Sequence, residues 1–578
     1  MGWRVDQTGM FTAAALLFAC GGDGLGSSGG ESDATLATAE SSNPLPTLVI
    51  NEVVCDGGDL VEIVNLGDDA IDVSAVFATD DLAGPNRAGF SPTTIAPGGF
   101  AVAALGQFGI KCANEPAIVV QDDEIVDEVT APTPEGIGQG WGRIPDGDGP
   151  WVATTPTPGA ANQAAGPVAD LFDIDVIRDI EVELGPESIA GIESQVAATF
   201  CDHADRDYFS GSVTIDGERF EGVGVRVRGN ATAESLYGKP SLKLDFAWDD
   251  PAVEGCASPR EVLGQRKLNL LNMRQDPSFI RIPLASELYR SVGVPQPRAS
   301  YARLTINGEY TGIVVMSQNI DRKFLGKWFP SNDGMMYEAA CFCDVSTVTQ
   351  PVDEASTCFA RDFSVDACDE PNPEHDPTDW SQLEQFAAEL AGLSSGFYPE
   401  VEQFFDFDGF LTLWAATMFL GSGDGYFLNQ NSYRIYHDPS AGTFAMIDHG
   451  SADGIMRTFA DQCVDDVLQL GEPTNLFGST STLPLRCQAE PDCLAAYAAR
   501  VWEIHDAFTE FGLGQRAQEL HDLIIEEMRA DPRYYYNGCG VLYEWADIEA
   551  HFGDYVLPWI AVRFDDVAAQ LAAAGFPR

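Results

Sequence analysis

Positive charge is scarce in this 578-residue chain, in which 32 Lys and Arg residues face 89 Asp and Glu residues and leave a formal net charge of −57. A surface this acidic repels phosphate backbones and anionic lipid head groups, so the composition argues against a general nucleic-acid binder. An anionic ligand would need a local basic pocket or a metal ion. The chain also lacks an uninterrupted apolar run of 18 residues, so we expect no transmembrane helix.

The N-terminus predicts export. Residues 10–19 form an apolar run that is too short to span a bilayer and matches the hydrophobic region of a secretory signal peptide. The segment Leu17-Phe18-Ala19-Cys20 resembles a bacterial lipobox, in which Cys20 is lipidated; a plain signal peptide cleaved nearby is the alternative. We therefore expect a lipoprotein signal peptide over 1–20 and a flexible linker over 21–45. The protein would lie at the cell envelope or outside the cell, contacting the membrane only through this anchor.

Twelve further cysteines form an even set, which in an exported chain indicates disulfide bonds. Zinc binding is the alternative interpretation of one cluster of four: Cys341, Cys343, Cys358 and Cys368. Its spacing matches no common zinc pattern and no His lies within it, so we favour disulfides. The pairing is not predicted.

Residues 46–163 predict a first domain made of short strands separated by Gly, Pro and Asp, as in a β-sandwich. The domain resembles the lamin-tail family, an immunoglobulin-like sandwich, which implies binding or spacing and no chemistry. The resemblance rests on Ile50-Asn51-Glu52, Val61-Glu62-Ile63-Val64-Asn65, Ile95-Ala96-Pro97-Gly98-Gly99, Trp141-Gly142-Arg143-Ile144-Pro145-Asp146-Gly147 and Thr157-Pro158-Gly159-Ala160-Ala161-Asn162. We interpret Asp146-Gly147-Asp148 as a turn, with calcium binding as the alternative.

Residues 168–578 predict an α+β domain, because strand-like and helical patterns alternate there. Asn307-Gly308 between two apolar runs predicts a β-hairpin, and residues 282–292 predict a helix that ends at Gly293. Apolar residues at helical spacing over 494–511, 515–528 and 557–574 predict a mainly helical C-terminal part over 461–578.

The second domain resembles the CotH family, named for spore coat protein H, which implies an atypical protein-kinase-like fold with its core motifs over 175–460. The motifs that carry this resemblance are Arg228-Gly229-Asn230, Lys239-Pro240-Ser241-Leu242-Lys243-Leu244, Lys267-Leu268-Asn269-Leu270-Leu271, Asp276-Pro277-Ser278-Phe279-Ile280-Arg281, Gly293-Val294-Pro295, Ile306-Asn307-Gly308-Glu309-Tyr310-Thr311-Gly312, Asp321-Arg322-Lys323-Phe324-Leu325, and the blocks 424–436 and 444–454.

Phosphoryl transfer needs positioned reactants and neutralised phosphate charge, and the second domain offers residues for both. Asp424 and Asn429 have the spacing of the Asp and Asn in a kinase catalytic loop, and Asp448 would match the metal-binding aspartate further along. We therefore expect Asp424 to act as the catalytic base or hydroxyl orienter, with Asn429 and Asp448 binding Mg²⁺ or Mn²⁺. The ATP phosphates would be held by basic residues, for which the candidates are Arg228, Lys239 and Lys243.

Two departures from the family pattern keep a second hypothesis open. Gln318 stands where the family usually has Glu, and Gly450 stands where a second aspartate is expected. The favoured function is a metal-dependent kinase that phosphorylates Ser or Thr of exported proteins. The alternative is a weakly active or inactive surface or coat protein that acts in attachment or assembly. A calcium-dependent adhesin is a third hypothesis.

Overall fold

The computed structural model describes residues 45–55, 60–82, 86–105, 116–122, 124–131, 140–164, 170–196, 206–229, 233–248, 261–273, 276, 278–332, 334–339, 342–347, 358–361, 380–393, 396–449, 463–464, 467–468, 475–533 and 550–578. Contacts divide the chain into two compact units, with Gln163–Arg578 forming most of the second. The predicted signal peptide, Cys20 and nearly all of the linker lie outside the described residues. Among the helices of the described part, none is long and apolar enough to cross a membrane.

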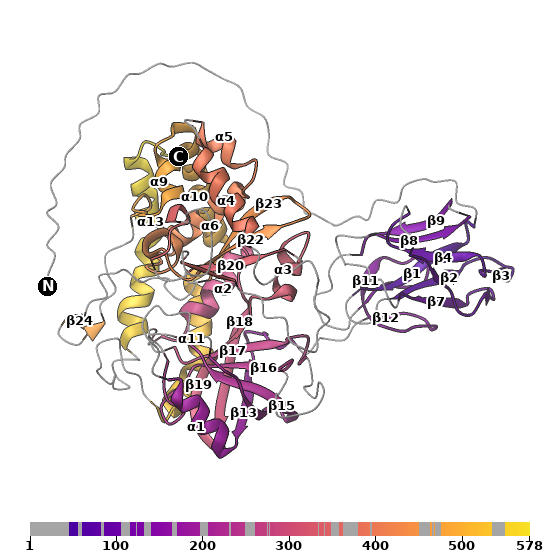
Figure 1. The fold of residues 1–578 in the computed structure, drawn as a ribbon, viewed down its shortest axis with the longest axis horizontal. Helices are drawn as coiled ribbons and strands as arrows, with labels where there is room; N and C mark the ends of the chain where they lie inside the picture. The colour runs from indigo at the N-terminus through magenta and orange to yellow at the C-terminus, as the bar shows by residue number, and fades with distance from the viewer. Residues whose placement is uncertain are drawn as a thin grey trace. The chain divides into compact units, whose positions relative to one another are not determined.

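The first unit consists of short strands whose two larger sheets share one apolar core (Figure 1). Ile50 and Ile63 from one sheet and Val119 and Val126 from the other are buried in that core, as in two sheets that pack face to face. The six-stranded sheet has the order β12 (Gln163–Ala164), β11 (Trp151–Thr155), β10 (Gly140–Arg143), β1 (Leu48–Val54), β2 (Leu60–Asn65), β7 (Phe100–Ala104). The four-stranded sheet has the order β5 (Ala88–Gly89), β4 (Val76–Thr79), β8 (Ala117–Gln121), β9 (Glu124–Val129), and β3 (Ile71–Asp72) pairs with β6 (Thr94–Ile95).

The second unit begins with a closed barrel whose interior is filled by aliphatic side chains such as Val225, Leu244 and Leu268. Its strands in barrel order are β13 (Ile177–Leu184), β14 (Phe209–Ile215), β15 (Glu218–Val227), β16 (Leu242–Asp245), β17 (Lys267–Leu271), β19 (Glu309–Gln318) and β18 (Ala299–Ile306). Closure is made by the parallel pair β13 and β18, while the other pairs are antiparallel. The predicted hairpin is confirmed: Asn307 and Gly308 both have positive φ, as the two-residue turn between β18 and β19 demands.

Helices and a second sheet form the rest of this unit, and Figure 1 shows the second sheet and most of the helices at the opposite end from most of the barrel. The sheet has the order β21 (Phe359–Arg361), β20 (Met336–Ala339), β22 (Tyr433–Asp438), β23 (Thr443–Asp448), and β24 (Cys463–Val464) pairs with β25 (Val467–Leu468). The helices are α1 (Pro186–Ser194), α2 (Arg281–Ser291), α3 (Arg322–Trp328), η1 (Val345–Thr347), α4 (Ser381–Gly392), α5 (Phe397–Val401), α6 (Phe407–Phe419), α7 (Tyr426–Asn429), α9 (Thr482–Gln488), α10 (Pro491–Phe511), α11 (Leu513–Ala530), η2 (Phe552–Val556) and α13 (Leu557–Ala573).

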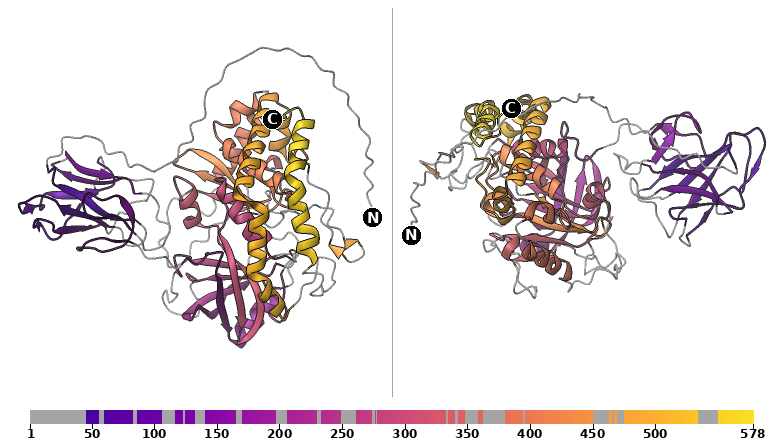
Figure 2. Two further views of the ribbon diagram at one scale, coloured as in Figure 1. Left: turned by 180° about the vertical axis from the view of Figure 1, so that it is seen from behind. Right: turned by 90° about the horizontal axis from the view of Figure 1, so that it is seen from above.

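The predicted C-terminal helices are confirmed as α10, α11 and α13, which pack against one another (Figure 2). Pro491 starts α10 and Gly512, with φ +75°, ends it, which is the usual placement of these two residues. Two disulfides, Cys343–Cys358 and Cys487–Cys493, confirm the disulfide interpretation for those four cysteines.

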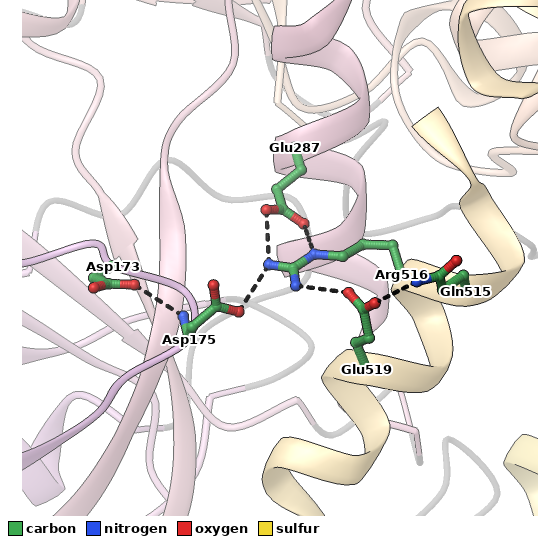
Figure 3. Close-up of polar contacts among 6 residues, drawn as sticks. All are labelled: Asp173, Asp175, Glu287, Gln515, Arg516 and Glu519. Atoms are coloured by element: carbon green, nitrogen blue, oxygen red, sulfur yellow. Dashed lines mark hydrogen bonds and ion pairs between the residues drawn. The ribbon is translucent and has the colours of Figure 1, made fainter. Parts of the chain in front are cut away.

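One arginine ties the long helix α11 to the barrel side of the unit. Arg516 donates to both carboxylate oxygens of Glu287 on α2, at 2.7 and 3.0 Å, and also contacts Asp175 and Glu519 (Figure 3). A guanidinium can hold three carboxylates in this way because its five N–H donors lie in one plane. Arg516 therefore fixes α11 against α2 and against the segment that enters β13.

Candidate active site

The candidate site is built on the loop that follows the buried helix α6. Gly421 and Gly425 have positive φ there, at +65° and +94°, and turn the chain so that α7 starts two residues after Asp424. Oδ1 of Asp424 accepts hydrogen bonds from the backbone N of Gly425 at 3.0 Å and from Nδ2 of Asn429 at 3.0 Å. Asn431 donates to the same oxygen at 3.2 Å. The predicted Asp and Asn are therefore in direct contact.

Asp448 reaches the same loop through the β22–β23 hairpin. It is the last residue of β23, pairs in register with Tyr433 and is fully buried. Its Oδ2 accepts from the backbone N of Tyr426 at 2.7 Å. The carboxylates of Asp424 and Asp448 thus accept from consecutive amides, those of Gly425 and Tyr426, and the structure brings the three predicted residues Asp424, Asn429 and Asp448 together.

A second layer of contacts holds this loop in place. Asp344 accepts from the Thr482 backbone N at 2.9 Å and from Nε2 of Gln430 at 3.4 Å. The hydroxyl of Tyr433 donates to the Cys343 carbonyl at 2.7 Å, and burial raises the pKa of Tyr433 well above its ordinary value, so the phenol stays protonated. Cys343 and Asp344 lie 86 or more residues before their partners Gln430 and Tyr433, and sequence patterns did not reveal these contacts.

The outer face of the barrel carries charged and polar side chains that include three cations. We call this set the polar row: Arg226, Lys243, Asp245, Lys267 and Asn269. These residues alternate with interior aliphatic residues and face one another across β15, β16 and β17, because Lys243 pairs in register with Arg226 and Asn269. Nζ of Lys267 lies 3.2 Å from Oδ2 of Asp245. Sequence analysis found Lys243 but missed Lys267, although both occupy outward positions of alternating strands.

Asp321 caps α3, and the charges of the polar row affect its pKa. Burial raises the pKa of Asp321, and the charges of Lys267 and Lys243 oppose that shift. Gln318 is the position where sequence analysis expects a departure from the family pattern, and its Oε1 accepts from the backbone N of Arg298 at 3.3 Å. The side-chain oxygen of Gln318 is therefore hydrogen-bonded to a backbone amide.

Arg228 directly follows β15, and its charge acts on His449, the residue that follows Asp448. Burial, together with the positive charges of Arg434 and Arg228, lowers the pKa of His449 well below its ordinary value, so this imidazole is neutral. Nη1 of Arg434 donates to Nδ1 of His449 at 2.7 Å, and its Nη2 lies 3.0 Å from Glu338. The positive charge of Arg228 therefore acts on the residue next to Asp448.

Lys239, the third predicted basic residue, is placed differently. It is buried, forms an ion pair with Asp531 just beyond α11, and lies 4.8 Å from the ring centroid of Phe279. Burial lowers the pKa of Lys239 to about 8 although Asp531 opposes that shift. Asp531 also accepts from the Ile313 backbone N at 3.2 Å, so this pair anchors the β15–β16 connection to α11 and β19.

The donor set of the site is chemically suited to a hard divalent cation, since it combines two carboxylates with a carboxamide. No group of three or more His, Cys, Asp or Glu residues arranged to hold a metal occurs in the part of the chain that the model describes. In the first unit, Asp146 accepts from Nδ2 of Asn51 at 3.0 Å and from the backbone N of Asn162 at 2.9 Å, as in the turn interpretation. Gly450 and Asp453 lie outside the described residues.

These observations define the class of the second unit: a β-barrel joined to a helical half, with an Asp-Asn loop and a hairpin aspartate converging in the helical half. A family model described as CotH kinase protein matches residues 225–549, which is more than half of the chain. The chain belongs to the CotH family.

Curated relatives agree with this assignment. Inner spore coat protein H of Bacillus subtilis (strain 168) is 22% identical over 190 residues, covering 33% of this chain and 50% of the relative. Invasin CotH3 of Rhizopus delemar is 23% identical over 291 residues, covering 48% of this chain and 43% of the relative. The chain therefore spans half or less of the length of these two relatives.

Proposed function

We propose that this protein is an exported, metal-dependent kinase that transfers the γ-phosphate of ATP to Ser or Thr residues of secreted or surface proteins. The proposal is carried by one observation: Asp424 and Asp448, distant in sequence, accept hydrogen bonds from consecutive amides, and Asn429 contacts Asp424. Phosphoryl transfer depends on positioned carboxylates and neutralised charge, and this convergence supplies the carboxylates.

The residues divide between the acceptor and the nucleotide. Asp424 is half-buried, so its carboxylate is accessible to a hydroxyl, and it would orient that hydroxyl and take its proton. Asp448 and Asn429 would hold Mg²⁺ or Mn²⁺, which when bound neutralises phosphate charge.

Cations from the barrel would complete the nucleotide site. Arg228, which directly follows β15 and whose charge acts on His449, and Lys243, in the polar row, would bind the ATP phosphates. We add Lys267 to this group because it shares the outer barrel face with Lys243. Lys239 contributes through the position of the β15–β16 connection, since its ammonium pairs with Asp531.

The test is Mn²⁺- or Mg²⁺-dependent ATP binding and autophosphorylation in Asp448→Asn and Asp424→Asn. Asn retains the side-chain oxygen that accepts from the Tyr426 or Gly425 amide while the charge is removed, so both variants should fold.

We expect Asp448→Asn to lose metal-dependent ATP binding. Asp424→Asn should retain binding and lose phosphotransfer by about 100-fold or more. Asp522→Asn on α11 is the matched control and should behave as the parent; a parent that binds no nucleotide contradicts the proposal.

A second candidate is a non-catalytic surface or coat protein, and two observations favour it. The neutral Gln318 replaces the family's Glu and is bonded to backbone. The relatives include a protein named for the spore coat and a protein named as an invasin. This candidate predicts that Asp448→Asn changes neither ligand binding nor attachment.

We also propose that the first unit is a lamin-tail-like sandwich that spaces or attaches the second unit, and that Cys20 carries a lipid anchor. The two disulfides and the coat and invasin relatives are consistent with a surface or extracellular protein. Metabolic labelling with a radioactive fatty acid, compared between the parent and Cys20→Ser, tests the anchor.

A further inference from the structure

Phe342 combines two features that are unfavourable for a folded chain. Its backbone has φ +59°, in the left-handed region that bulky side chains rarely adopt. Its side chain is 64% exposed, so the ring gains little packing in return. A strained and exposed aromatic side chain suggests that the residue functions by binding another molecule.

The neighbouring residue fixes Phe342 beside the candidate site. The backbone N of Cys343 donates to the Gln430 carbonyl at 2.9 Å, and the Cys343 carbonyl accepts from the Tyr433 hydroxyl at 2.7 Å. Cys343 is buried and is bonded to Cys358. Phe342 is therefore attached to the loop immediately after Asn429, the residue that contacts Asp424.

The loop on the other side of this junction is strained as well. Gln430 and Ser432 have φ values of +52° and +53°, so three left-handed residues other than glycine meet where Cys343 joins the loop. Strain of this kind concentrates where a binding or reacting group must be presented in one fixed orientation. The hydrogen bonds of Cys343 hold the backbone next to Phe342 against this loop.

We propose that Phe342 is a docking residue for the polypeptide that is phosphorylated, which would contact the ring with an apolar side chain close to its Ser or Thr. This inference rests on the proposed kinase function. The acceptor is favoured over the nucleotide because Phe342 is attached to the loop of the proposed hydroxyl-orienting Asp424, whereas the proposed phosphate-binding cations come from the barrel. Exposed aromatic residues fixed in one orientation are frequent anchors of polypeptide recognition.

The experiment measures phosphorylation of a Ser/Thr peptide library, varied at each position around the hydroxyl, with Mn²⁺ and ATP. The parent should prefer an apolar residue at one position. Phe342→Ala should lose that preference and raise KM for the preferred peptide about tenfold, with kcat and the KM for ATP within about twofold. Phe342→Leu should retain most of the preference. Val562→Ala is the matched control, because Val562 on α13 is also exposed, at 53%.

Phe342→Gly separates docking from stability. Glycine adopts positive φ without strain, so this variant should unfold at the same or a higher temperature than the parent while its peptide KM rises as in Phe342→Ala. An unchanged peptide KM in both variants, in an active parent, overturns the docking role and leaves the kinase proposal intact. Self-association that Phe342→Ala abolishes without changing peptide KM also overturns it. A parent without ATP binding or phosphotransfer removes both proposals together.

Discussion

The two units bury carboxylates in different ways. In the first unit, Glu52 and Glu62 are fully buried and accept hydrogen bonds from amides: Thr157 N donates to Glu52 at 2.9 Å, and Asn51 Nδ2 and Gly159 N donate to Glu62 at 3.0 and 2.6 Å. In the second unit, the buried Asp531 and Asp245 are paired with lysines. Burial raises the pKa of both Glu62 and Asp531; amide hydrogen bonds oppose the shift in Glu62, whereas the ammonium of Lys239 opposes it in Asp531.

The distribution of cations explains this difference. Only four of the 32 Lys and Arg residues, Arg4, Arg87, Lys111 and Arg143, precede residue 164. The first unit therefore has few cations to place beside its buried acids. As a result, burial and the nearby charges of Glu52 and Asp146 raise the pKa of Glu62 to about 7 despite its amide contacts.

Carboxylates that accept hydrogen bonds from amides occur in both units. Asp424 and Asp448 accept from backbone amides just as the acids of the first unit do. Amide contacts to a carboxylate are therefore no sign of function by themselves. The candidate site differs because its loop contains the left-handed Gln430 and Ser432.

The largest effect is expected from breaking a cation–carboxylate pair in the second unit. Lys239→Met leaves Asp531 buried without its ammonium partner, which should lower the free energy of unfolding by about 3–5 kcal/mol. Urea unfolding of the second unit measures this loss. Lys323→Met removes a partly exposed pair with Glu261 and should cost less than about 1 kcal/mol. Equal losses in the two variants would contradict the distinction between buried and exposed pairs.

The disulfides offer a test of how the loop is supported. The Cys343→Ala/Cys358→Ala double variant opens a link across 15 residues and should lose about 3 kcal/mol of stability. Because Cys343 holds Gln430, the variant should also weaken metal-dependent ATP binding, measured by titration. The Cys487→Ala/Cys493→Ala pair, which spans 6 residues, should lose about 2 kcal/mol with ATP binding unchanged. Equal binding in both double variants would show that the Cys343 link does not support the site.

The raised pKa of Glu62 predicts a pH dependence that is specific to the first unit. The folded state keeps its proton up to about pH 7, whereas the unfolded chain releases it near 4.5, so stability falls as pH rises through that window. The expected slope approaches ~1.4 kcal/mol per pH unit. Glu62→Gln mimics the protonated acid and should remove this fall, so thermal unfolding of the two proteins at pH 5 and pH 8 should differ only at the higher pH. Parallel pH profiles would refute the assignment.

The smallest effect should come from the partly exposed network of Arg516 (Figure 3). Arg516→Lys replaces a two-pronged contact with Glu287 by a single point charge and should cost about 1 kcal/mol, less at 0.5 M salt. Arg529→Lys on the same helix alters a more exposed pair with Glu526 and should change stability by under about 0.5 kcal/mol. A larger loss in Arg529→Lys would reverse the expected order.

Much of the local structure could be predicted from sequence. Asn307-Gly308 predicted the β18–β19 hairpin because positive φ at two successive positions is a local property. The helices α10, α11 and α13 followed from apolar spacing in the same way. The spacing of Asp424, Asn429 and Asp448 also identified residues that the structure brings together.

What sequence reasoning missed depends on pairs that lie far apart in the chain. Asp531, the partner of Lys239, is 292 residues away, and nothing in the Lys-Pro-Ser motif distinguishes a buried anchor from a phosphate ligand. The pairing of Arg434 with Glu338 and His449 likewise depends on strands β20, β22 and β23 lying side by side.

The sequence by itself determined the acidic character, the turns, the helices and the residue types available for chemistry, because these follow from composition and short-range sterics. Only the tertiary structure decided which lysine is an anchor and which lies on the outer barrel face, and which acids converge. Charge–charge contacts depend on distance in space, and folding sets that distance through the barrel closure and the β22–β23 register.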